Sequence, residues 1–309
     1  MTPTESWPRV AVVGAGAVGG YFGGLLARAG APVVMIGRPA FVEAVNKNGL
    51  FLDLLQFQES VRVEASSDLN AVRGADFALF CVKTTDSAAT AREIAPLLAP
   101  NAIVVSLQNG VDNVEQIRAA SQIEALPAVV YIGASVPEPG RIKHAGRGDL
   151  VIGPENDRTK RVAALFAGAS VGCRISENIE GELWTKLIWN CALNAVSALG
   201  HARYGQIAAN ENARKVVVAL VDEVLAVAHA AHVVFPTLQN AEAAHAGALK
   251  IATQLTETFS STAQDMQRGK RTEIDSLNGF IARRGAELGV PTPVNHALYA
   301  LVKLAEAKS

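Results

Sequence analysis

Residues 9–19 read RVAVVGAGAVG, an apolar run that ends in three spaced glycines. β-Branched residues dominate the start of the run, as is typical of a buried strand. The residues that follow include LLARA at 25–29, a helix-forming segment, and Gly30 then supplies a stop signal. The stretch therefore predicts a strand, a tight glycine turn and a helix in direct succession.

The three glycines have separate roles in a turn of this kind. Gly14 permits the tight turn, Gly16 lets the backbone approach a phosphate, and Gly19 allows the helix to pack closely on the strand. The start of the helix adds free N–H groups and a positive dipole end, which both attract an anion. A turn without a ligand is the alternative. We expect this turn to bind the pyrophosphate of a dinucleotide through Gly14, Ala15, Gly16, Ala17, Val18 and Gly19.

The end of the second predicted strand distinguishes between two cofactors. An NAD site carries Asp or Glu about 20 residues after the glycines, where it binds the ribose 2′-hydroxyl. Residues 35–39 here read MIGRP, so the acid is missing and Arg38 follows the strand. A guanidinium matches a 2′-phosphate in charge and geometry. Arg38 thus favours NADP over NAD, although an arginine after a strand is also common on protein surfaces.

Strand-like and helix-like segments alternate over the first half of the chain. Strands are predicted at 9–13, 33–36, 77–82, 103–107, 128–132, 150–152 and 172–175. Helices are predicted at 19–29, 86–98 and 111–120, and a loop at 137–140. This alternation predicts an α/β fold with a parallel Rossmann-type sheet over residues 1–177. From 178 to 309 apolar residues recur at helical spacing, which predicts an all-helical second domain.

The composition narrows the class of protein. The 309 residues include 28 Lys and Arg against 29 Asp and Glu, so neither a nucleic-acid-binding nor a membrane-binding surface is expected. Residues 1–8 lack the basic and apolar regions of a secretion signal. Cys81, Cys173 and Cys191 form no disulfide framework or zinc motif, and the histidines have no third ligand at metal spacing. These features predict a soluble cytoplasmic protein without a bound metal.

Polar residues follow two further predicted strands. Lys83 comes directly after the strand at 77–82, and Asn109 follows the strand at 103–107. Ligands of open parallel sheets bind beyond the carboxyl ends of the strands, so both side chains are placed to reach a cofactor or a substrate. A lysine in solvent and a turn-forming Asn-Gly pair explain the same residues without a ligand.

A polar stripe runs along one predicted helix of the second domain. Lys186, Asn190 and Asn194 are spaced four apart in WTKLIWNCALN at 184–194, so they share one face among apolar residues. Asparagine is a poor helix former, and two of them on one face indicate a lined cavity. A lysine there could donate a proton to a carbonyl oxygen as hydride reaches the carbon. An ordinary solvated stripe is the alternative.

Two polar clusters lie further along the chain. Residues 259–265 read FSSTAQD, and their hydroxyl and N–H groups could bind a carboxylate. Residues 271–279 read RTEIDSLNG, in which Glu273 could orient a lysine or could equally belong to a helix start. Spacing alone does not bring either cluster to Lys186.

Taken together, these motifs resemble those of the ketopantoate reductase family, the NADPH-dependent step towards pantothenate. The resemblance covers nearly the full length. Its markers are GAGAVGG at 14–20, CVKTTD at 81–86, QNGVDN at 108–113, GRIKHAGRGDLVIG at 140–153, WTKLIWNCALN at 184–194 and FSSTAQDMQRGKRTEIDSLNG at 259–279. The resemblance implies reduction of 2-dehydropantoate to (R)-pantoate, with NADP(H) bound in a cleft between the domains.

The resemblance also implies roles for single residues. Lys186 would donate the proton to the keto oxygen, and Glu273 would belong to the cofactor and active-site network. Asn109 would touch both cofactor and substrate, Lys83 would lie near the nicotinamide, and Arg38 would contact the 2′-phosphate. The substrate, a small 2-oxo acid, would be bound by Asn109, Asn190, Asn194 and Ser261.

Two positions depart from the family pattern and keep other functions open. Thr258 stands where an asparagine often precedes the serine pair, and segment 198–204 lacks an asparagine that can help hold substrate. One rival is therefore a D-2-hydroxyacid dehydrogenase for another branched or aromatic 2-oxo acid, and a second is an NADP(H) sensor without catalysis. The apolar helices at 216–232 and 298–304 fit packing within one subunit or across a homodimer.

Overall fold

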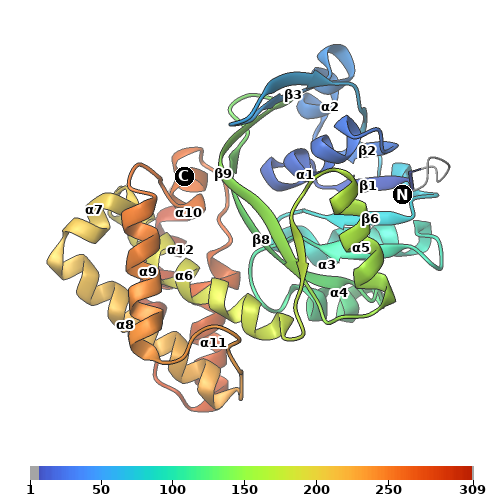
Figure 1. Cartoon of the computed structure of the whole chain (residues 1–309). Helices are drawn as coiled ribbons and strands as arrows, with labels where there is room; N and C mark the ends of the chain where they lie inside the picture. The colour runs from blue at the N-terminus through green and yellow to red at the C-terminus, as the bar shows by residue number, and fades with distance from the viewer. Residues whose placement is uncertain (1–6, 308–309) are drawn as a thin grey trace. The chain divides into compact units, whose positions relative to one another are not determined.

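The computed structural model describes residues 7–307 of the chain (Figure 1). Most of segment 1–8, where no secretion signal is predicted, lies outside the described residues. No helix within the described range is both long and apolar enough to cross a membrane. The chain divides into two compact units, which are Met1–Gln108 with Asp112–Ile179, and Asn109–Val111 with Glu180–Ser309.

One sheet forms the centre of the first unit, and its ten strands lie in the order β4-β3-β9-β8-β7-β6-β1-β2-β5, with β10 paired to β9. The strands are β1 Val10–Val13, β2 Val33–Ile36, β3 Leu50–Asp53, β4 Gln58–Val61, β5 Glu64–Ser66, β6 Phe77–Phe80, β7 Ile103–Ser106, β8 Leu126–Ser135, β9 Arg141–Ile152 and β10 Cys173–Ile175. Strand β1 pairs in parallel with β2 and β6, and β6 with β7. The predicted parallel Rossmann-type sheet is confirmed.

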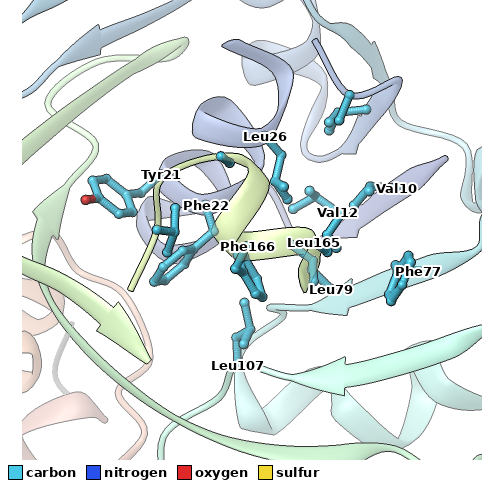
Figure 2. Close-up of a cluster of buried hydrophobic side chains, with 14 of the residues drawn as sticks. Val10, Val12, Tyr21, Phe22, Leu26, Phe77, Leu79, Leu107, Leu165 and Phe166 are labelled. Atoms are coloured by element: carbon cyan, nitrogen blue, oxygen red, sulfur yellow. The ribbon is translucent and has the colours of Figure 1, made fainter. Parts of the chain in front are cut away.

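Helices cover both faces of this sheet. They are α1 Ala17–Arg28, α2 Pro39–Asn48, α3 Ser87–Ile94, α4 Asn113–Ser121 and α5 Asp157–Gly168, with 3-10 turns at η1 Leu69–Val72, η2 Thr84–Asp86 and η3 Ala95–Leu97. Val12 of β1 packs in one core with Phe22 of α1 and Phe166 of α5 (Figure 2). Val13 packs on the opposite face with Ile94 of α3. Because successive strand side chains point to opposite faces, a strand covered on both is apolar throughout.

The edge of the sheet differs from the prediction. Strands β3, β4 and β5 are not among the predicted strands. Strands β4 and β5 lack an apolar run; β4 reads QESV and exposes its first three residues. Strand β3 reads LFLD, so an apolar signal was present there and was missed. The predicted strands at 128–132 and 150–152 are parts of β8 and β9, which pair antiparallel. The predicted loop at 137–140 joins them. Most of β9 is only intermittently buried, so its apolar signal is confined to its last residues.

The second unit is helical, as predicted. Its elements are α6 Ile179–Leu199, α7 Tyr204–Ala209, α8 Glu211–Ala230, α9 Ala241–Gln254, α10 Ser261–Gln267, η4 Ile274–Ser276, α11 Asn278–Leu288 and α12 Pro293–Glu306. Its core joins Ile188 and Cys191 of α6 to Val221 of α8 and Ala248 of α9. The small alanine lets α9 approach its neighbours closely. Helix α6 is thereby fixed along its apolar side, and this orientation determines where its polar stripe lies.

Candidate functional site

The glycine turn has the geometry that its sequence predicts. Gly14 has a φ of +104°, and a Cβ there would lie 2.6 Å from the backbone N of Val82. A Cβ on Gly19 would lie 2.4 Å from the carbonyl oxygen of Gly14, so helix and strand approach as closely as glycine allows. Gly16 is exposed, and a Cβ there would meet nothing within 4 Å. The turn is therefore packed against protein at Gly14 and Gly19 and open at Gly16, which fits the approach of a phosphate group.

The end of β2 adjoins this turn directly. The carbonyl oxygen of Ile36 accepts hydrogen bonds from the N–H groups of Gly14 and Ala15 at 3.0 and 2.9 Å. Two residues further on, Arg38 is exposed at the start of α2. An arginine that follows Ile36 therefore stands beside the glycine turn. Between the glycines, the chain carries the partly buried residues Ala15, Ala17 and Val18.

A buried glutamine joins the ends of β6 and β7. The side-chain amide of Gln108 donates to the carbonyl oxygen of Val82 at 2.9 Å and to the hydroxyl of Ser87 at 2.6 Å. Its oxygen accepts from the hydroxyl of Ser106 at 3.0 Å. Lys83 is half-buried directly after Val82. Sequence reasoning missed Gln108, although a polar residue placed directly after an apolar strand was the available signal.

Three predicted site residues come together in the second unit. The ammonium nitrogen of Lys186 on α6 donates to Oδ1 of Asn109 at 2.8 Å. The amide nitrogen of Asn109 donates in turn to Oε2 of Glu273 at 3.2 Å. Lys186 and Glu273, the two partners of Asn109, both lie far from it in the sequence. The carboxamide bridges an ammonium and a carboxylate, and this arrangement sets its orientation because an ammonium needs an acceptor and a carboxylate needs a donor.

The polar stripe of α6 is not a solvated surface. Asn194 is 3% exposed, and Lys186 and Asn190 are half-buried. The oxygen of Asn194 accepts from the hydroxyl of Tyr204 at 3.2 Å, and its nitrogen donates to the hydroxyl of Ser261 at 3.5 Å. Protein therefore encloses the stripe at Asn194, whereas Lys186 and Asn190 keep part of their surface exposed; the lined cavity remains a prediction.

The adjacent serines at the start of α10 differ in their contacts. Ser260 is 1% exposed; its hydroxyl donates to the carbonyl oxygen of Asn194 at 3.0 Å and accepts from the N–H of Ala263. It caps α10 and ties this helix to α6. Ser261 is exposed, and its hydroxyl faces the amide of Asn194. Of the two, Ser261 is the one available to a ligand.

The segment that carries Glu273 is anchored to α12. Oε1 of Glu306 accepts from the N–H of Thr272 at 2.6 Å, and Lys303 contacts the other oxygen at 3.2 Å. Lys303 also donates to Asp275 at 2.9 Å. Burial acts to raise the pKa of Glu306, but hydrogen bonds from Thr272 and Lys303 outweigh it, so the pKa lies below its usual value. The carboxylate form therefore holds this segment in place.

This anchor predicts a pH-dependent stability. A carboxyl group whose pKa is lowered by folding stabilises the protein above its unfolded pKa of about 4.3, and this contribution is lost as the pH falls through the folded pKa. We expect Glu306→Gln to lower the free energy of unfolding by about 1–2 kcal/mol at pH 7. Denaturant titrations should show this difference shrinking between pH 5 and pH 3.

A suitable control is Glu287→Gln, since Glu287 is 60% exposed and pairs with Arg284 three residues away in its own helix. That variant should change stability little at either pH. A destabilisation by Glu306→Gln that stays constant down to pH 3 would contradict the anchoring role.

The cysteines do not form a reactive centre. Burial raises the pKa of Cys173 to about 12 and raises those of Cys81 and Cys191 further, so all three stay protonated near neutral pH. Within residues 7–307 no group of three or more His, Cys, Asp or Glu side chains could hold a metal ion.

Comparison with known proteins adds family information. Residues 10–157 match the family model described as ketopantoate reductase PanE/ApbA, and residues 178–306 match the model of its C-terminal part. A 2-dehydropantoate 2-reductase of Pyrococcus horikoshii is 31% identical over 97% of this chain and 98% of its own length. The two family models together span both halves of the chain.

Solved structures similar to this chain include a member of the same family. A PanE/ApbA family ketopantoate reductase from Ralstonia eutropha JMP134 superposes with a TM-score of 0.91 at 47% identity, and covers 97% of this chain and 99% of its own. A D-mandelate dehydrogenase, solved with NADH and anilino(oxo)acetate, superposes with a TM-score of 0.90 at 22% identity over 97% of this chain and 98% of its own. At that identity the second likeness extends to the fold alone.

Proposed function

This chain belongs to the ketopantoate reductase family, and on that premise we propose that it reduces 2-dehydropantoate to (R)-pantoate with NADPH. The observation that carries the proposal is the hydrogen-bonded series from Lys186 through Asn109 to Glu273. A lysine held in this way is suited to donate a proton to a keto oxygen. A protein that only senses NADP(H) has no need of such a group.

The residues of the glycine turn fit the cofactor. The open space above Gly16 would admit the pyrophosphate, while Gly14 and Gly19 keep the turn closed below. Arg38 would contact the 2′-phosphate that distinguishes NADPH from NADH, and Lys83 would lie near the nicotinamide. The bound cofactor supplies the hydride that reduces the keto carbon at C2 of the substrate.

The remaining chemistry falls to the residues of the second unit. Lys186 would stabilise the negative charge that develops on the keto oxygen and would donate a proton to it. Asn109 holds the ammonium group in place by accepting from it, and Glu273 holds Asn109. The substrate carboxylate and hydroxyl would be bound by Asn190, Asn194 and Ser261, which offer donors at one side of α6.

The test of this function follows the loss of NADPH absorbance with a panel of 2-oxo acids. We expect 2-dehydropantoate to give the highest kcat/KM. A higher kcat/KM with another branched or aromatic 2-oxo acid would contradict the proposed substrate and support the proposed type of reaction. NADPH binding without oxidation by any acid of the panel would favour a sensor instead.

Cofactor preference gives a separate prediction at Arg38. We expect Arg38→Ala to raise the KM for NADPH by about 10–100-fold, because a charged contact with the 2′-phosphate contributes about 1.5–3 kcal/mol. The KM for NADH should change little. Steady-state kinetics with both cofactors measure the two effects.

Arg92→Ala is the matched control for that experiment. Arg92 is exposed in the last turn of α3. The ligand-binding edge of the sheet lies at the other end of this helix, where α3 begins. Its replacement should leave both cofactor constants unchanged. An equal rise in the KM for NADH and NADPH in Arg38→Ala would argue against a 2′-phosphate contact.

A further inference from the structure

Tyr204 contacts one of the proposed substrate-binding residues from behind. It is the first residue of α7, it is 9% exposed, and its hydroxyl donates to Oδ1 of Asn194 at 3.2 Å. On the other side, the amide nitrogen of Asn194 donates to Ser261 at 3.5 Å. The Asn194 carboxamide thus lies between a phenol and an exposed serine.

The buried phenol determines which way the carboxamide points. A phenolic O–H needs an acceptor when it is buried, and Oδ1 of Asn194 is the acceptor that it has within residues 7–307. If the carboxamide turned by half a revolution, the O–H would face an NH2 group and a buried donor would lose its partner. Burial raises the pKa of Tyr204, so the phenol stays protonated and remains a donor.

The backbone fixes Tyr204 in this position. Its N–H donates to the carbonyl oxygen of Thr258 at 3.0 Å, and the N–H of Gly205 donates to Thr256 at 3.0 Å. The turn at residues 256–258 leads into the serine pair, and the hydroxyl of Ser260 itself donates to the carbonyl oxygen of Asn194 at 3.0 Å. The phenol, the carboxamide and Ser261 are therefore held by one connected set of hydrogen bonds.

We propose that Tyr204 is a positioning residue, which turns the Asn194 carboxamide so that its N–H donors serve Ser261 and the bound 2-oxo acid. The inference rests on the proposed function. One N–H of Asn194 is bonded to Ser261, and the second has no acceptor within residues 7–307. This second N–H is a donor for a ligand acceptor beside Asn194, and the carboxylate of a 2-oxo acid is the acceptor common to the whole substrate class.

The first test is Tyr204→Phe, which removes the hydroxyl and keeps the ring. With a 2-oxo acid that the wild type reduces, we expect the KM to rise about five- to tenfold while kcat and the Kd for NADPH stay within about twofold. In an Asn194→Ala background the same substitution should leave KM unchanged. A control in the first unit is Tyr131→Phe, which should change none of the three constants, KM, kcat and the Kd for NADPH.

The second test does not depend on activity. The side-chain amide signal of Asn194 in the ¹⁵N–¹H spectrum, assigned by its absence in Asn194→Ala, should shift in Tyr204→Phe and exchange faster with solvent. An unchanged signal, an unchanged KM, or the same rise of KM with and without Asn194 would overturn the inference. If the wild type reduces no 2-oxo acid, the proposed function fails. The amide signal of Asn194 still tests whether Tyr204 orients its carboxamide.

Discussion

Replacing Lys186 with alanine is expected to lower kcat by about 10²–10⁴-fold, because a positioned general acid contributes this much to proton transfer. The binding of NADPH should be retained, since the residues proposed to bind it lie elsewhere in the sequence. The change removes a long side chain whose nitrogen donates to Oδ1 of Asn109 at 2.8 Å. Single-turnover kinetics and a fluorescence titration with NADPH measure the two quantities separately.

A matched control for Lys186 is Lys215→Ala. Lys215 lies on α8 of the same unit, is 70% exposed, and pairs with Glu211 four residues away on its own helix. Its loss should leave kcat within about twofold, since exposed pairs of this kind contribute little. Turnover close to that of the wild type in Lys186→Ala would contradict the proposed role of this lysine as the proton donor.

The second large effect is expected at Gly14. An alanine there would be placed at a φ of +104°, with its Cβ 2.6 Å from the backbone N of Val82. The strain and the required backbone shift together should lower the free energy of unfolding by at least about 2–3 kcal/mol. Denaturant titration should show this as a lower midpoint, and binding of the dinucleotide should be lost with the turn.

Gly16 provides the matched comparison two residues away. Its φ is −85°, and a Cβ would meet nothing within 4 Å, so Gly16→Ala should fold with unchanged stability. The new methyl group would occupy the space proposed for the pyrophosphate, and the Kd for NADPH should rise about tenfold or more. A variant that binds NADPH as the wild type does would show that the phosphates are bound elsewhere.

The central part of the fold could be predicted from the sequence because it depends on local patterns of apolar residues and glycines. Strand β1 is apolar throughout, since Val12 and Val13 are buried on opposite faces. The glycine turn follows from the close contacts of Gly14 and Gly19. The strand pair β8–β9 was less predictable, because its register is interrupted and much of its length is only partly buried.

The candidate site was predictable in its residue types and not in its contacts. Helical spacing placed Lys186 and Asn194 on one face, as a repeat of 3.6 residues requires. The contact between Asn109 and Glu273 joins residues 164 positions apart, which no local pattern encodes. No signal in the sequence indicated the role of Tyr204, because its hydroxyl acquires Asn194 as a partner only in the folded chain.

Helix α6 has a practical consequence for altering this protein. Its polar residues Lys186, Asn190 and Asn194 recur once per turn, so neighbours along the row are separated by about 6 Å on a stiff rod. Lys186, the proposed proton donor, and Asn194, which we propose binds another part of the ligand, are thereby kept at a constant separation. Protein engineers could redesign the turn around Asn194 to accept longer or bulkier acids while the other end of the rod keeps its chemistry.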